Sequence, residues 1–142
     1  MAYLADVNVL FAIIVKDHQH CGLANKWLSG IQSSSQIGVC RVTQMGLLRL
    51  LTRRTVMGDG LLSAVEAWNV VNVMMSDDRF FWVDDTIQVN LAWSEIIGGL
   101  EGQETPSTDT YLAALATALG LTWATLDSGF KRFTHLKLWL LA

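Results

Sequence analysis

Short apolar runs alternate with longer amphipathic segments along this chain. The continuous apolar runs predict buried strands, and the longer segments have the periodicity of helices. The predicted strands are residues 3–5, 37–40, 79–83, 121–126 and 137–141, and the predicted helices are residues 7–15, 23–30, 41–54, 63–75, 86–99 and 109–119. Strands that alternate with helices in this way are typical of βαβ units, so the pattern predicts an α/β fold with a mostly parallel sheet.

Local signals fix several of these boundaries. Ser63 and Glu66 have the spacing of a capping box, in which each residue satisfies a free backbone group at a helix start. Gly30, Gly98 and Gly120 follow apolar periodic segments and predict helix ends there.

The segment 41–54 carries two sets of apolar positions. Val42, Met45, Leu48 and Thr52 recur on one face at helical spacing, with Leu47, Leu50 and Leu51 nearby, so the pattern predicts a helix here.

Composition indicates one domain over residues 1–142 that keeps apolar surface for a partner. Of the 142 residues, 51% are hydrophobic and 16% are charged, and the mean hydropathy is +0.34. A membrane segment is the alternative explanation, but no apolar run approaches the roughly 20 residues that span a bilayer. No signal peptide is evident, and two cysteines that form no close pair suit a reducing compartment. We therefore expect a cytoplasmic protein without a membrane segment.

The charge balance argues against a broadly basic, nucleic-acid-coating surface. The formal net charge is −3 and the sequence pI is about 5.5. A local basic rim remains open, because Arg49, Arg53 and Arg54 cluster at one predicted helix end and two further basic residues follow Asp127.

Three aspartates are the candidates for chemistry, although each has an ordinary structural explanation. Asp6 follows the first predicted strand and suits a helix cap. Asp109 lies in a first helical turn, where the helix dipole favours an anion. Asp127 begins "DSG", which is an ordinary turn composition. For any one of them alone, the structural explanation is preferred.

Their joint placement favours a metal site. Ligands of parallel α/β sheets bind at the carboxyl ends of the strands, and Asp6 and Asp127 each follow a strand directly. A crossover helix starts near the same edge, so Asp109 reaches it as well. Crowded carboxylates repel one another unless a cation lies between them or a pKa rises. Oxygen-only ligands suit Mg²⁺ or Mn²⁺, which would activate a water and stabilise an attacked phosphodiester.

The ordered segments "LADVNVLFAI", "CRVTQMGLLRLLT", "LSAVEAW" and "STDTYLAALATALGLTWATLDSGFKRF" resemble the PIN-domain nucleases, specifically the VapC-type toxins of bacterial toxin–antitoxin pairs. The resemblance runs nearly end to end. It implies a PIN-like three-layer α/β/α fold, an Mg²⁺- or Mn²⁺-dependent endoribonuclease that hydrolyses RNA phosphodiester bonds, and neutralisation by a cognate antitoxin protein.

The resemblance also implies roles for individual residues. Asp6, Asp109 and Asp127 match the family's catalytic, metal-binding acids. Asn8 and Thr125 match neighbouring polar groups that support those acids.

One position departs from the family pattern. Many PIN domains carry a glutamate early in the helix after the second strand, where this chain has Gln44. Gln44 offers a carbonyl oxygen without charge at this catalytic position, so a second metal would be weakly held. The alternative hypothesis is therefore a catalytically weak PIN-like domain that binds RNA or protein, and RNA cleavage by the purified protein discriminates the two.

Other motifs carry weaker hypotheses. A zinc site in "DHQHC" (17–21) is disfavoured because no second ligand pair follows. A phosphotransfer receiver domain ranks last, because Lys131 is poorly placed for its expected lysine and Asp6 lies on the first strand, where a receiver would carry its phosphoacceptor at the end of a central strand. His18, Arg41 and Arg49 are candidate RNA contacts.

The apolar excess predicts interfaces with other chains. We expect a homodimer and a separate antitoxin groove that both draw on residues 42–52 and 63–75. The tryptophans at 27, 68 and 93 lie in helical apolar patterns, so core or interface packing is preferred to base stacking for them.

Overall fold

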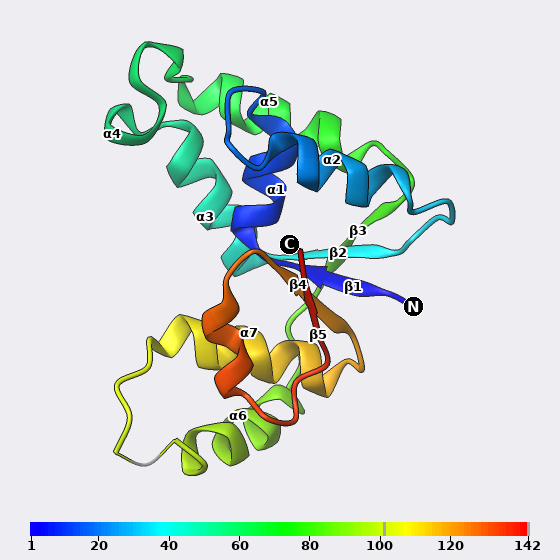
Figure 1. The fold of residues 1–142 in the computed structure, drawn as a ribbon, viewed down its shortest axis with the longest axis vertical. Coiled ribbons are helices and arrows are strands. Elements are labelled where there is room, and N and C mark those ends of the chain that lie inside the picture. The colour runs from blue at the N-terminus through cyan, green and yellow to red at the C-terminus, as the bar shows by residue number, and fades with distance from the viewer. Residues whose placement is uncertain (101, 142) are drawn as a thin grey trace.

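A five-stranded parallel sheet forms the centre of the protein, as the computed structural model of residues 1–100 and 102–141 shows (Figure 1). The strands are arranged in the order β3-β2-β1-β4-β5, and every pairing between neighbours is parallel. Their bounds are β1 Tyr3–Ala5, β2 Ile37–Cys40, β3 Phe80–Val83, β4 Thr122–Thr125 and β5 Leu138–Leu140.

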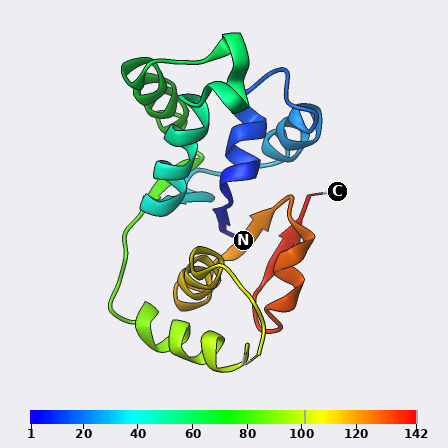
Figure 2. The same cartoon turned by 90° about the vertical axis from the view of Figure 1, so that its left-hand side faces the viewer.

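Helices cover both faces of this sheet (Figures 1 and 2). One face carries α1 Val7–Ile14, α2 Cys21–Ser29, α3 Arg41–Leu51, α4 Arg54–Met57 and α5 Ala64–Met75. The other carries α6 Val89–Gly98 and α7 Ser107–Ala118, and short 3₁₀ turns span Gly58–Gly60 and Ser128–Arg132. The predicted three-layer α/β/α architecture with a mostly parallel sheet is confirmed.

Strand alternation divides the apolar side chains between the two layers of helices. Leu4 and Ala5 are both fully buried neighbours on β1, yet Leu4 packs into the cluster under α6 and α7 while Ala5 packs into the cluster under α1, α3 and α5. Successive side chains of a strand point to opposite faces, so a short, wholly apolar strand such as β1 can serve two cores.

Gly38 on β2 leaves room for side chains of the neighbouring strand β3. A Cβ at Gly38 would lie 2.6 Å from Cγ2 of Val83, which is closer than packed carbon atoms approach. Phe81 Cζ and the backbone oxygen of Tyr3 lie 3.1 Å from that position, so any side chain at 38 would displace the Val83 and Phe81 side chains.

Most boundary signals in the sequence are present in the fold. The capping box of Ser63 and Glu66 is formed at the start of α5, and Gly30 caps α2. Gly120 takes a left-handed φ of +67° two residues after the end of α7, a conformation that glycine adopts without steric cost.

The helix predicted over residues 41–54 is present but shorter than predicted. It ends at Leu51, and Thr52 donates its hydroxyl to the carbonyl of Leu48. The buried positions are Thr43, Gln44, Leu47 and Leu51, whereas Met45 is 57% exposed. Two polar residues, which apolar periodicity does not count, therefore occupy the inner side of the first turn.

Within the described residues, no helix is both long enough and apolar enough to cross a membrane.

Candidate active site at the carboxyl edge of the sheet

Asp6 lies at the point where β1 ends and α1 begins. Its backbone is extended, with φ −70° and ψ 152°, and it is the N-cap residue of α1. Its amide donates to the carbonyl of Ala124 on β4 at 2.9 Å, and its own carbonyl accepts from Val9 and Leu10. The chain therefore continues the sheet up to Asp6 and turns into the helix directly after it, which leaves the carboxylate at the carboxyl edge.

The hydroxyl of Thr125 joins three groups of this edge. It donates to Oδ2 of Asp6 at 2.6 Å, and it accepts from Nδ2 of Asn8 at 3.3 Å and from the amide of Asp127 at 3.0 Å. Asn8 also accepts, through Oδ1, from the amide of Leu126 at 3.1 Å. The two polar residues that were expected to support the acids thus tie the end of β4 to the start of α1.

Burial raises the pKa of the Asp6 carboxyl. Only 6% of the residue is exposed, and this burial, helped by the negative charges of Asp109 and Asp127, raises the pKa of Asp6 to about 6. The hydrogen bonds from Thr125 and the Val7 amide act in the opposite direction and lower it. Asp6 is thus a buried carboxylate in a field of like charges.

The other two acids approach the same edge from different elements. Asp127 follows β4 as the N-cap of the Ser128–Arg132 turn, where its Oδ1 accepts from the amide of Gly129 at 2.8 Å. Asp109 lies in the first turn of α7, and its Oδ2 accepts from Nη2 of Arg132 at 2.8 Å. Asp127 is exposed and Asp109 is partly exposed.

The arrangement has the right chemistry for a divalent cation but does not form a closed cage. In the part of the chain that the structure describes, no three His, Cys, Asp or Glu side chains are grouped closely enough to hold a metal ion. The donors are nevertheless all oxygens, and a cation would offset the unfavourable burial of the charged Asp6. These residues therefore fit Mg²⁺ or Mn²⁺ with water completing the coordination, and a shared ion remains a prediction.

Gln44 lies in the first turn of α3, only 4% exposed. Its Oε1 accepts from Nη1 of Arg41 at 2.6 Å. The side-chain carbonyl that the sequence offered to a metal is therefore already engaged by a guanidinium from the same turn.

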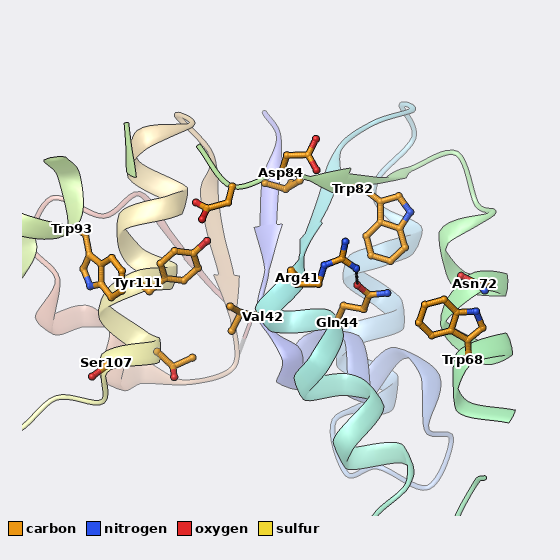
Figure 3. A pocket seen from close by; sticks show the side chains of 13 residues that line it. Arg41, Val42, Gln44, Trp68, Asn72, Trp82, Asp84, Trp93, Ser107 and Tyr111 are labelled. Carbon is orange, nitrogen blue, oxygen red and sulfur yellow. Dashed lines mark hydrogen bonds between the residues drawn. The ribbon is translucent and has the colours of Figure 1, made fainter. Parts of the chain in front are cut away.

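A cleft of about 1010 Å³ opens next to the acidic edge. Figure 3 shows Trp93, Tyr111 and Ser107 along one wall, with Trp68, Asn72 and Trp82 along the other. Arg41 and Gln44 lie between these walls, and Asp84 lies beside Trp82 at the end of β3. Ser107 and Thr108, which directly precede Asp109, also line the cleft.

Two of the tryptophans in this cleft offer their rings to solvent. Trp68 is 51% exposed and Trp82 is 46% exposed, so Trp68 is not part of the core, and interface packing stays the prediction for it. Trp93, by contrast, donates its indole N–H to Thr110 at 2.9 Å and packs edge-on against Tyr111. Burial, followed by the nearby charge of Asp85, raises the pKa of Tyr111 to about 12, so its hydroxyl stays neutral.

The three candidate RNA contacts are in different places. Arg41 is exposed and lines the cleft, whereas Arg49 is exposed two turns further along α3. His18 lies in the loop beyond α1, eight helical residues away from the acidic edge. Burial and the neighbouring His20 lower the pKa of His18, which weakens its attraction for phosphate.

Sequence reasoning missed two residues of this region. Arg132 pairs with Asp109, and the only signal was its place five residues after Asp127 in a basic pair. Trp82 lies on the edge strand β3 with its ring outward, and the run "RFFWV" gave no sign of which aromatic would be exposed.

The fold agrees with comparisons to known proteins. The family model described as the PIN domain matches residues 3–136, and the chain belongs to the PIN-domain family. The ribonuclease VapC41 of Mycobacterium tuberculosis is 35% identical over 153 aligned residues, which cover 98% of this chain and 98% of the relative. The ribonuclease VapC29 of the same organism is 35% identical, covering 91% and 88% of the two chains.

Solved structures of low sequence identity share the architecture. A chain of VapBC2 from Rickettsia felis, bound to a DNA fragment of its promoter, superposes with a TM-score of 0.75 at 18% identity over 100% of both chains. A chain of VapBC-1 from nontypeable Haemophilus influenzae gives a TM-score of 0.77 at 15% identity, covering 99% of this chain and 98% of that one. These similarities concern the fold.

Proposed function

We propose that this protein is a single PIN domain over residues 1–142 that acts as a divalent-metal-dependent endoribonuclease, the toxin component of a toxin–antitoxin pair. The observation that carries the proposal is the buried Asp6 carboxylate at the carboxyl edge. The negative charges of Asp109 and Asp127 contribute to its raised pKa. The ribonuclease relatives that match over nearly the whole chain support the reaction. A reaction on RNA also suits a cytoplasmic location.

Asp6, Asp109 and Asp127 would hold Mg²⁺ or Mn²⁺ at this edge. The ion would supply an activated water and would offset negative charge on the phosphodiester during hydrolysis. Thr125 holds Oδ2 of Asp6 in place, and Asn8 holds Thr125 through its own contact with the Leu126 amide. These contacts fix the carboxylate before substrate arrives, which is the condition for efficient electrostatic stabilisation.

The cleft beside the acids is the proposed path of single-stranded RNA. The exposed ring of Trp82 is a stacking surface for an unpaired base. Two carboxylates, Asp84 and Asp85, line the cleft together with the guanidinium of Arg41. The carboxylates would repel a phosphate, so a nucleobase is a better occupant of this space. With a base stacked on Trp82, the neighbouring phosphate would lie toward Asp109.

Apolar side chains on the α4 and α5 side are the proposed protein interfaces. They share high exposure and lie on one layer of the fold: Met45, Val56, Val65, Trp68 and Val73. We infer a homodimer through this surface and an adjoining groove for a cognate antitoxin, which the toxin–antitoxin complexes among the structural neighbours support. Light scattering at micromolar concentration tests the dimer, and a monomer would contradict it.

Cleavage of RNA by the purified protein tests the main proposal. We expect a single-stranded RNA to be cut in the presence of Mg²⁺ or Mn²⁺, and to remain intact with a chelator or in the Asp6→Asn variant. Cleavage that persists in Asp6→Asn would remove Asp6 from the site.

A second candidate function rests on Gln44. Its carbonyl is engaged by Arg41 and adds no charge to the edge, which favours a catalytically weak domain that holds RNA or a protein. RNA binding without metal-dependent cleavage would support this alternative.

A further inference from the structure

Arg132 makes two directed contacts at the acidic edge. Its Nη2 donates to Oδ2 of Asp109 at 2.8 Å, and its Nη1 donates to the carbonyl oxygen of Gly129. The paired side chains are only 25% and 27% exposed. The guanidinium therefore connects the first turn of α7 to the turn that follows β4.

Gly129 extends this connection to Asp127. Its amide donates to Oδ1 of Asp127 at 2.8 Å. A Cβ at this position would lie 2.9 Å from Nη1 of Arg132 and 2.9 Å from Oδ1 of Asp127. A side chain at 129 would therefore displace one of these two groups, and Arg132 is linked directly to one acid and through Gly129 to another.

Aromatic packing restricts the guanidinium further. It lies 4.6 Å from the ring centroid of Phe133 and 5.6 Å from that of Phe130, both of which are buried. Its Nε is buried without a hydrogen-bond partner among residues 1–100 and 102–141. Leaving a buried donor unpaired is unfavourable, so Nε does not hold the side chain in this position. The contacts with Asp109, Gly129 and the two rings hold it there instead.

We propose that Arg132 is a positioning residue that occupies Asp109 in the metal-free protein and competes with a divalent cation for it. The proposal rests on the metal-dependent function proposed above. Three like charges at one edge repel one another, and Arg132 offsets one of them when no cation is present. A guanidinium and a divalent cation repel each other in turn, so the same contact lowers the affinity of the edge for metal. Arg132 would thereby raise the concentration of divalent metal at which the site becomes occupied.

The Arg132→Met variant separates this role from simple packing. It keeps the length and apolar stem of the side chain but removes the charge. We expect Mn²⁺, titrated by calorimetry, to bind roughly tenfold more tightly than to wild type, since a charge within about 4–6 Å shifts an ionic equilibrium by about one to three pK units. The melting temperature of the metal-free protein should fall. Loss of packing alone would not tighten metal binding.

Arg79 provides a matched control remote from the acids. It forms an ion pair with Asp77 at 2.6 Å, with side chains 27% and 33% exposed. Arg79→Met should lower the metal-free melting temperature and leave the Mn²⁺ dissociation constant unchanged. Should Arg132→Met fail to fold, Arg132→Lys serves instead, because it keeps a cation without the forked contact, and we expect a smaller tightening of Mn²⁺ binding.

Two results would overturn the inference in distinguishable ways. If wild type binds Mn²⁺ and the Arg132 variants bind it equally or more weakly, Arg132 does not compete with the cation, whereas the proposed function stands. If wild type binds neither Mn²⁺ nor Mg²⁺, the metal-dependent function fails and this inference fails with it.

Discussion

Thr125 donates its hydroxyl hydrogen to Oδ2 of Asp6 at 2.6 Å, and the surrounding amides fix the direction of that bond. The amide of Asp127 and Nδ2 of Asn8 both donate to the same hydroxyl oxygen. A hydroxyl has one hydrogen and two lone pairs, so all three are in use and the hydrogen is left for Asp6. Thr125, the last residue of β4, therefore holds the Asp6 carboxylate in place through the hydrogen that it donates.

The Thr125→Val variant tests this relationship, because valine has nearly the same shape and no hydroxyl. It leaves three polar groups without their partner, so we expect the free energy of unfolding to fall by about 1–3 kcal/mol. The pKa of Asp6 should rise further, since the Thr125 hydrogen bond lowers it. Urea unfolding of the metal-free protein at pH 7 measures the first effect.

Thr125→Ser is the matched control for that measurement. It keeps the hydroxyl and loses one buried methyl group, for which we expect a loss of about 1 kcal/mol. Equal destabilisation by valine and serine would mean that packing, and not the hydroxyl, accounts for the effect.

The pH dependence of stability should report on Asp6. The pKa of Asp6 is raised from 3.8 to about 6 in the folded protein, so the folded state binds the proton more tightly than the unfolded chain does. Its destabilising effect is absent below pH 3.8, grows as the pH rises through this interval and is complete above about pH 6. We expect metal-free wild type to lose at most about 3 kcal/mol across this window from this group.

Asp6→Asn should remove that slope and make the metal-free protein more stable at pH 7 by about 1–3 kcal/mol. Asparagine still accepts the hydroxyl of Thr125, so this contact survives. Unfolding free energies between pH 4 and pH 7 provide the measurement. Asp17→Asn, in the exposed loop beyond α1, leaves the buried carboxyl in place and should keep the wild-type slope. A wild-type slope in Asp6→Asn would mean that another group dominates this window.

Apolar periodicity predicted the fold well because the sheet and its helices are defined by burial. It located β2 at residues 37–40 and the capped start of α5 at Ser63, since both depend on residues adjacent in sequence. The strand-end rule likewise predicted where Asp6 and Asp127 would emerge.

Contacts between distant residues were beyond the same reasoning. The pairing of Arg132 with Asp109 spans 23 positions, and the apolar pattern gave no sign that Gln44 is buried on α3. Such features depend on how side chains from separate elements fill one space, for which a single sequence carries no periodic signal.

Trp82 should contribute to RNA binding through stacking. Replacing a stacked aromatic by alanine typically removes about 1–3 kcal/mol of binding free energy per base. We expect Trp82→Ala, in an Asp6→Asn background that prevents cleavage, to weaken binding of a fluorescent single-stranded RNA by about that amount. Fluorescence anisotropy measures the affinity.

Trp139 is a matched control on the opposite edge of the sheet. It is 45% exposed, against 46% for Trp82, and lies on β5 with its ring edge-on to Tyr3. Trp139→Ala should leave RNA affinity unchanged. Equal weakening by both variants would contradict a base site in the cleft, and a change in oligomeric state with Trp82→Ala would assign that ring to a protein interface.

The last prediction concerns Gln44 and Arg41, whose side chains meet at 2.6 Å. Gln44→Glu adds a carboxylate at nearly the same shape, in the position where many PIN domains carry an acid. Because Arg41 already contacts this atom, the new charge would form an ion pair and would be largely offset. We therefore expect Gln44→Glu alone to change the Mn²⁺ dissociation constant by less than about threefold. The double variant with Arg41→Met should bind Mn²⁺ roughly tenfold more tightly, since the added charge is then unpaired.

Calorimetric titration of wild type, both single variants and the double variant completes the cycle. Tightening by Gln44→Glu alone as large as in the double variant would show that Arg41 does not screen this position. No tightening in either would place residue 44 outside the reach of the metal.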